Sequence, residues 1–195
     1  MKFLIPVLIV ILSWMGMGQS GAQTIAFGPD TAKIFGYISY SVVGKYKARF
    51  NSFKGRIALD EKWQRIRSVY LEINAGSIKS NHPWYDRIVR SPRALYTAKY
   101  PKIIFKSDEI NQDKGGYMVR GILEMHGVKR RMVFPFKVGI AVDRATKRKL
   151  LVFTGHWKIN RKDFNIVWNR LLDRGGVLVG DYFTVNWVIK AYMNP

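Results

Sequence analysis

The histidines are the first side chains to weigh as metal ligands, because the chain contains no cysteine. His82, His126 and His156 are the only three. They fall in a predicted loop, a predicted turn and a predicted strand, and no two have the i, i+4 spacing or the carboxylate link of a metal site. The sequence therefore predicts no metal site, and we interpret each histidine as structural.

Carboxylates, serines and glycines give little support for catalysis. Asp86, Asp163, Asp173 and Asp181 could pair as acid and base, but buried or turn-capping carboxylates explain them equally well. The serines lack the context of a nucleophile elbow, and the glycine-rich segment 175–180 does not link a strand to a helix as a phosphate loop does. We predict no catalytic residue and no cofactor, and we expect a binding protein rather than an enzyme.

A long strand dominates the pattern that must position any site. From Val128 to Asp143 the residues alternate between an almost wholly apolar set and a set that carries most of the charge and the strand breakers. A period of two over that length predicts one β-strand with a buried face and a solvated face. A long, one-sided antiparallel strand is typical of barrels and sandwiches.

Shorter alternating segments joined by Gly, Asn and Asp turns continue this pattern along the chain. They predict an all-β protein, with one or two short helices over 83–100, where prolines occupy helix-starting positions. His126-Gly127 predicts a tight reversal. The other expected strands are 34–40, 46–53 with its extension 55–59, 68–74, 102–110, 117–125, 150–159 and 182–192.

The inward faces of the predicted strands are rich in large apolar side chains. A barrel of about eight strands can be filled by such side chains or can leave room for one small ligand, and the residue types alone do not decide between the two. If the interior is hollow, its lining is predicted to comprise Val119, Leu123, Met125, Met132, Phe134, Phe136, Val138, Phe153, Trp157, Trp168, Phe183, Val185 and Trp187.

The first residues predict export. Residues 1–22 combine a basic start, an apolar run and the small residues Ser20, Gly21 and Ala22, which is the pattern of a cleaved secretory signal peptide. We expect cleavage after Ala22, a single domain over 23–195 and a periplasmic location. The formal net charge is +20, and the cations are spread over most strands. In an exported protein this favours contact with an anionic membrane over binding of nucleic acid.

Several short motifs, in order along nearly the whole predicted domain, resemble the YceI-like family of periplasmic polyisoprenoid-binding proteins. They include FNSFKGRIALD at 50–60, LEMHGV at 123–128, NRKDF at 160–164 and GGVLVGD at 175–181. The resemblance implies an extended lipocalin-like antiparallel barrel of about eight strands, which encloses an isoprenoid chain and has short helices near its mouth. We expect Arg130, the one charge on the apolar face of the long strand, to lie near that mouth.

The chain departs from the family pattern around the predicted helices. Ile88-Val89 replaces a His-Leu pair, and Arg93 stands where an acidic residue is expected. The added bases suggest an anionic head group, held by Arg87, Arg90, Arg93 and Arg161. The alternative is a filled barrel that docks on anionic membrane or envelope polymer through its basic surface. The identity of the lipid and the oligomeric state are left open.

Overall fold

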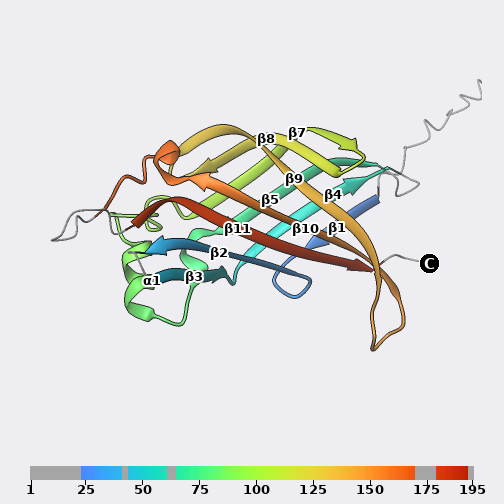
Figure 1. The fold of residues 1–195 in the computed structure, drawn as a ribbon, viewed down its shortest axis with the longest axis horizontal. Helices are drawn as coiled ribbons and strands as arrows, with labels where there is room; N and C mark the ends of the chain where they lie inside the picture. Colours follow the sequence, from blue (N-terminus) through green and yellow to red (C-terminus); the bar gives the residue numbers. More distant parts are fainter. Residues whose placement is uncertain (1–22, 41–43, 61–64, 170–178, 193–195) are drawn as a thin grey trace, which may run out of the picture.

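A computed structural model describes residues 23–40, 44–60, 65–169 and 179–192. The predicted signal peptide lies outside these ranges. Within them, one antiparallel sheet of eleven strands curls around an apolar interior (Figure 1). The order of strands in the sheet is β1-β4-β5-β7-β8-β9-β10-β11-β2-β3-β6. The strands are β1 Gln23–Phe27, β2 Ala32–Tyr40, β3 Gly44–Phe50, β4 Phe53–Leu59, β5 Ile66–Asn74, β6 Ile78–Lys79, β7 Lys102–Asp113, β8 Gly116–Met125, β9 Val128–Val142, β10 Lys149–Asn160 and β11 Val179–Tyr192.

The link between β3 and β4 explains why the sheet curls. Only Asn51 and Ser52 separate these strands, yet β3 pairs with β2 and β6 at one end of the sheet order, and β4 pairs with β1 and β5 at the other. A link of two residues spans at most about 11 Å between the flanking Cα atoms. The two ends of the sheet must therefore come together, which is consistent with the predicted lipocalin-like barrel.

The predicted number of about eight strands is wrong. Residues 46–59 form two strands that belong to distant parts of the sheet, because the chain turns at Asn51-Ser52. The other additions are β1, which has five residues, and β6, which has two. Strands this short carry too few alternations to stand out from the surrounding sequence.

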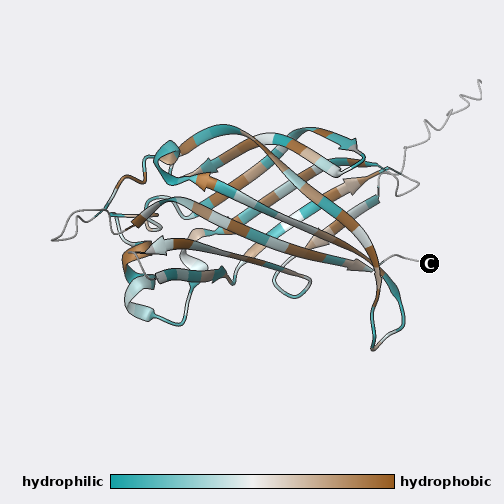
Figure 2. Cartoon of the chain, viewed as in Figure 1, coloured by the Kyte–Doolittle hydropathy of each residue, from teal (hydrophilic) through white to brown (hydrophobic). Residues whose placement is uncertain are grey.

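The predicted long strand is confirmed as β9, and the reversal before it occurs at His126-Gly127. Both turn residues have positive φ angles, 52° and 74°, as the type I′ turn of a two-residue hairpin requires. Phe134 and Phe136 are buried on one face of β9, and Figure 2 shows apolar and polar residues alternating along the strands.

Short helical elements lie beside the sheet. The helix α1 spans Pro83–Arg90, which confirms the expected helix, and turns follow it over 91–99. The 3-10 helices η1 and η2 span Ala75–Ser77 and Arg161–Phe164. In the part of the chain that the structure describes, no helix is both long and apolar enough to cross a membrane. In Figure 1, α1 and η2 lie at the same end of the curled sheet.

Candidate functional site

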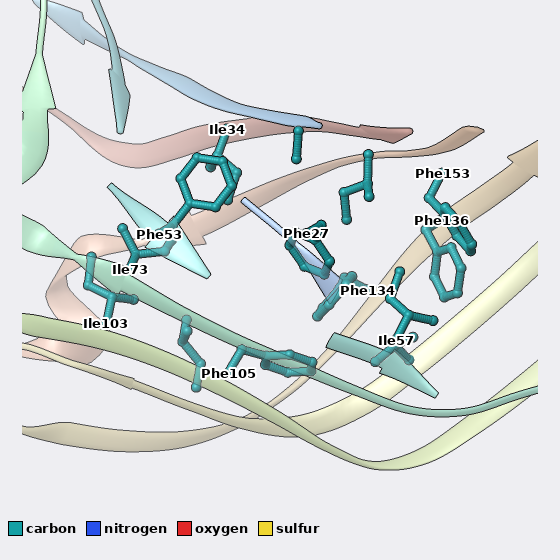
Figure 3. Packing of buried hydrophobic residues seen from close by; sticks show 14 of the residues in the cluster. Phe27, Ile34, Phe53, Ile57, Ile73, Ile103, Phe105, Phe134, Phe136 and Phe153 are labelled. Atoms are coloured by element: carbon teal, nitrogen blue, oxygen red, sulfur yellow. The ribbon is translucent and has the colours of Figure 1, made fainter. Parts of the chain in front are cut away.

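The interior of the sheet contains an apolar cavity of about 200 Å³. A buried water needs only about 10–15 Å³ on this measure, so the space is far larger than a packing defect. Tyr37, Tyr46 and Thr184 are hydroxyl-bearing members of a lining whose surface is almost wholly apolar. Side chains from several strands project into this interior, among them Phe27, Phe105 and Phe134 (Figure 3). The interior is therefore hollow rather than filled, a choice that the sequence alone left open.

Most residues predicted to line a hollow interior do line this main cavity. Met132 and Val138 do not: they are partly buried and pack against the core cluster around it. Trp168 lies in the wall of a second pocket. The predicted residues in the main cavity wall are Val119, Leu123, Met125, Phe134, Phe136, Phe153, Trp157, Phe183, Val185 and Trp187.

The prediction missed the contribution of the N-terminal half of the chain. Ile34 and Ile38 of β2, Ala48 of β3 and Leu71 of β5 also face the main cavity. Their alternation was present in the sequence and could have identified them. Leu95 lies in the irregular segment after α1, where no periodicity marks it.

The second pocket, of about 60 Å³, adjoins the main cavity at the α1 end of the sheet. The two spaces share wall residues Ile38, Tyr46, Val89, Leu95 and Phe183. The outer wall of the second pocket is supplied by α1, by the turns after it, by the segment after η2 and by β11. The two spaces are therefore adjacent.

A buried carboxylate fastens α1 to the sheet between the two spaces. Asp86 is 4% exposed and accepts hydrogen bonds from the Tyr46 hydroxyl at 2.7 Å and the Ser80 hydroxyl at 2.6 Å, together with the Ser80 main-chain N–H. Burial acts to raise the pKa of Asp86, but these hydrogen bonds and the nearby Arg90 outweigh it and lower the pKa below its ordinary value. Burial and the bond to Asp86 raise the pKa of Tyr46. Asp86 is thus an anion that positions α1.

The four predicted head-group arginines occupy different environments. Arg93 is exposed and lines the second pocket. Arg87 is exposed on α1 and lines neither space. Arg90 is partly buried and its Nη2 donates to the Ile78 carbonyl. Of the three arginines in the 83–93 segment, Arg93 is therefore the one that lines the second pocket.

Arg161 lies in the second pocket wall but its guanidinium binds main chain. The residue is 1% exposed. Its Nε donates to Gly180 O at 2.9 Å, its Nη1 to Ile166 O at 2.6 Å and Trp168 O at 2.8 Å, and its Nη2 to Val179 O at 3.3 Å. These bonds join the segment after η2 to the start of β11.

Two of the sequence motifs that support the family resemblance meet in space. Asn160 caps η2, because its side chain accepts a hydrogen bond from the Lys162 N–H at 3.0 Å. His126 Nδ1 lies 2.9 Å from the Phe164 carbonyl oxygen, and the Arg130 Nε donates to Asp163 O at 2.9 Å. Arg130 therefore lies against η2, whose Arg161 lines the second pocket, and its predicted place near a mouth stays a prediction.

The groups considered for catalysis are dispersed. His82 precedes α1, and His156 is exposed on β10. Asp181 pairs with Lys162 at 2.8 Å, and Asp173 lies outside the described residues. In the described ranges, no group of three or more histidines and carboxylates could hold a metal ion.

Comparison with known proteins relates the chain to one family. A family model described as the YceI-like domain matches residues 24–191. Protein YceI of Shigella sonnei is 33% identical over 117 residues, which cover 60% of this chain and 61% of that protein. A UPF0312 protein of Pectobacterium atrosepticum is 32% identical over the same length and the same shares. The matched region thus spans about 61% of the length of these curated relatives.

Solved structures share the fold at low sequence identity. BcnA of Burkholderia cenocepacia has a TM-score of 0.66 at 22% identity, over 82% of this chain and 96% of that one. A polyisoprenoid binding domain from Saccharophagus degradans, implicated in plant cell wall breakdown, has a TM-score of 0.61 at 14% identity, over 90% and 100%. These likenesses establish the fold.

Proposed function

Because the chain belongs to the YceI-like family, and because its sheet encloses an apolar cavity, we propose that it binds an isoprenoid or a similar long-chain amphipathic lipid. The lipid chain occupies the main cavity, and its polar end lies at the second pocket. The protein sequesters or carries the lipid by binding and performs no chemistry on it. The signal-peptide pattern of residues 1–22 supports a periplasmic location for this activity.

The main cavity is the observation that carries the proposal. Its lining is almost wholly apolar, so a hydrocarbon chain placed in it would exchange water for apolar side chains. Removing apolar area from water contributes about 25 cal/mol for each Å², before the costs of binding.

Arg93 supports an anionic head group on the bound lipid. Its guanidinium is the exposed cation in the wall of the second pocket, and charge-assisted hydrogen bonds to phosphate or carboxylate are stronger than neutral ones. Arg161 in the same wall is committed to main-chain carbonyls and to Asp181, whose Oδ1 lies 3.5 Å from its Nη2. The proposed head-group contact is therefore Arg93, and a prenyl phosphate supplies the matching anion.

Lipid extraction tests the proposal. Protein purified from its native envelope is extracted with organic solvent, and the extract is analysed by mass spectrometry. We expect about one long-chain lipid per protein, as one enclosed apolar space implies. An extract without stoichiometric lipid, together with no capture of added prenyl phosphate, would contradict the proposal.

A charge reversal at Arg93 tests the head-group assignment. Arg93→Glu should weaken capture of an anionic prenyl phosphate roughly tenfold or more, since it replaces attraction by repulsion at the pocket. Capture of a neutral isoprenoid of equal length should be unchanged. The matched control is Arg87→Glu, which makes the same charge change on the exposed face of α1. Equal losses in both variants would rule out a specific role for Arg93.

The alternative of a filled barrel that acts only through its basic surface is less well supported. It requires a packed interior, whereas the main cavity is open and apolar. The basic surface itself is compatible with both functions.

A further inference from the structure

Three large apolar side chains are exposed next in sequence to residues that line the second pocket. Trp84 is 56% exposed, Val167 is 67% exposed and Tyr182 is 56% exposed. They come from α1, from the segment after η2 and from β11. We call these three residues the apolar rim.

Each member of the apolar rim is a chain neighbour of the pocket wall. Trp84 precedes Tyr85, Tyr182 precedes Phe183, and Val167 lies between Ile166 and Trp168; these four neighbours all line the second pocket. In each case one residue faces the pocket while the next is exposed to solvent. The apolar rim therefore consists of exposed residues next in sequence to second-pocket wall residues from three elements.

Cations lie among and beside these side chains. Arg93 lines the pocket, Arg87 is exposed on α1, and Lys45 and Lys47 are exposed on either side of Tyr46, which belongs to the walls of both spaces. These side chains give the end of the molecule a positive surface.

Among the residues that the structure describes, the acidic ones at this end do little to offset that charge. Asp86 is buried and hydrogen-bonded, and Asp181 is paired with Lys162. Asp163 is exposed, but its main-chain carbonyl accepts from Arg130, so a further cation lies beside it. The surface around the apolar rim therefore attracts anions.

We propose that the apolar rim is a membrane-docking surface and that its partner is an anionic lipid bilayer. Tryptophan and tyrosine favour the boundary between head groups and acyl chains, and arginine and lysine are attracted to anionic head groups. Docking would hold the second pocket against the bilayer, so that a lipid could pass between the membrane and the main cavity without crossing water. The passage of lipid rests on the proposed function, whereas docking itself needs no bound ligand.

The opposite end of the molecule offers a matched control. Ile140 and Val142 of β9 are 68% and 56% exposed, and the β9–β10 hairpin that carries them extends away from α1 (Figure 1). Lys149 pairs with Val142, so cations accompany these apolar residues too. Neither Ile140 nor Val142 lines the main cavity or the second pocket. The two ends therefore both carry exposed apolar residues and cations. They differ because only the apolar rim adjoins residues of the second pocket wall.

Vesicle flotation compares the two ends directly. The full protein is mixed with vesicles of phosphatidylcholine and phosphatidylglycerol in equal parts, and with vesicles of phosphatidylcholine alone. Wild type should float with the mixed vesicles, less so as salt is added. The double variant Trp84→Ser/Val167→Ser should partition roughly tenfold more weakly, because it loses apolar area buried in the bilayer. The double variant Ile140→Ser/Val142→Ser should change by less than about twofold.

Three results would overturn the inference: no flotation of wild type with mixed vesicles, no loss in the rim variant, or an equal loss in the hairpin variant. All four positions are exposed, so unchanged unfolding midpoints should show that both variants remain folded. Capture of a water-dispersed prenyl phosphate is measured in parallel. Capture without docking would overturn the inference and leave the proposed function standing, whereas docking by a protein that captures no lipid would support the inference and contradict the proposed function.

Discussion

Arg161 shows how a cation in a pocket wall can serve the fold rather than a ligand. Its three nitrogens donate to four main-chain carbonyls, from Ile166, Trp168, Val179 and Gly180. The planar guanidinium suits this task because it presents several donors in fixed directions. The residue type alone, next to an apolar site, is equally compatible with a head-group ligand.

Arg161→Lys should therefore destabilise the protein strongly. A lysine ammonium has three donors on one atom and cannot reach carbonyls on several sides, so buried carbonyls lose their partners. We expect a loss of about 3 kcal/mol in the free energy of unfolding, measured by urea denaturation. Arg93→Lys, an exposed control, should change it by no more than about 0.5 kcal/mol. A stable Arg161→Lys protein with impaired lipid capture would instead support a ligand role for Arg161.

The Asp86 network should make part of the stability depend on pH. The pKa of Asp86 in the folded protein is lowered, against the effect of burial, by hydrogen bonds from Ser80 and Tyr46. The unfolded value is near 3.9, so the folded state favours the ionised form. Its contribution is complete above about pH 4 and is lost as the pH falls through the lower folded value.

The test compares wild type with Asp86→Asn. At pH 7 the variant should be less stable by about 1–3 kcal/mol, because the amide cannot accept all of the carboxylate's hydrogen bonds. The difference between the two proteins should shrink as the pH is lowered below about 4. Tyr46→Phe, which keeps the Ser80 donors, should show a smaller difference at pH 7. A gap that stays constant between pH 7 and pH 3 would contradict the assignment.

At the scale of single elements, β9 shows that an apolar residue at an alternating position need not be buried. The apolar set of this strand continues through Ile140 and Val142, but both are exposed. The reason is that β8 pairs with β9 only as far as Tyr117 opposite Phe136. Beyond that point β9 pairs with β10 on one side and with no strand of the described residues on the other, so no neighbouring described strand helps to cover its apolar face there.

The pairing of β10 with β11 places Gly155 against the side chain of Trp187, which lines the main cavity. Gly155 lies opposite Trp187, and a Cβ at Gly155 would come within 2.4 Å of the indole. Gly155→Ala should force Trp187 towards the main cavity and lower the free energy of unfolding by about 1–3 kcal/mol. Gly139→Ala in β9 is the matched control, since nothing lies within 4 Å of its added Cβ. Urea denaturation of both variants checks the prediction, and equal effects would refute it.

At the scale of the whole molecule, the hollow interior predicts an unusual response to larger side chains. Ala48 of β3 lines the main cavity, whereas Ala191 of β11 is buried in the core cluster and does not. Ala191→Phe should cost about 1–3 kcal/mol through overpacking. Ala48→Phe should cost less than about 1 kcal/mol, because the ring can enter open space.

Lipid capture should respond in the opposite order. Ala48→Phe should reduce the capture of a long isoprenoid because it occupies the cavity. Ala191→Phe should affect capture only as far as it unfolds the protein. Unfolding midpoints and capture by extraction, measured on the same samples, separate the two effects. If both variants were equally destabilised, the interior around Ala48 would be packed rather than hollow.

Particular residues show how far sequence could predict this fold. The alternation of β9, the reversal at His126-Gly127 and the helix at Pro83–Arg90 all follow from local rules, and ten of the predicted lining residues face the main cavity. The two-residue β6 and the separation of β3 from β4 were missed. Their boundaries depend on which distant strands they pair with, and local periodicity does not contain that information.

The sequence by itself determined that the strands have one apolar and one polar face, that the turns are tight and that the molecule is strongly basic, because each depends on residue type and on spacing along the chain. The tertiary structure decided that the interior is hollow, that Arg93 lines the second pocket while Arg161 binds main chain, and that Trp84, Val167 and Tyr182 are exposed next to residues of the second pocket wall. These properties depend on distances between side chains that come from separate elements. Such distances arise only when the sheet curls and its two ends meet.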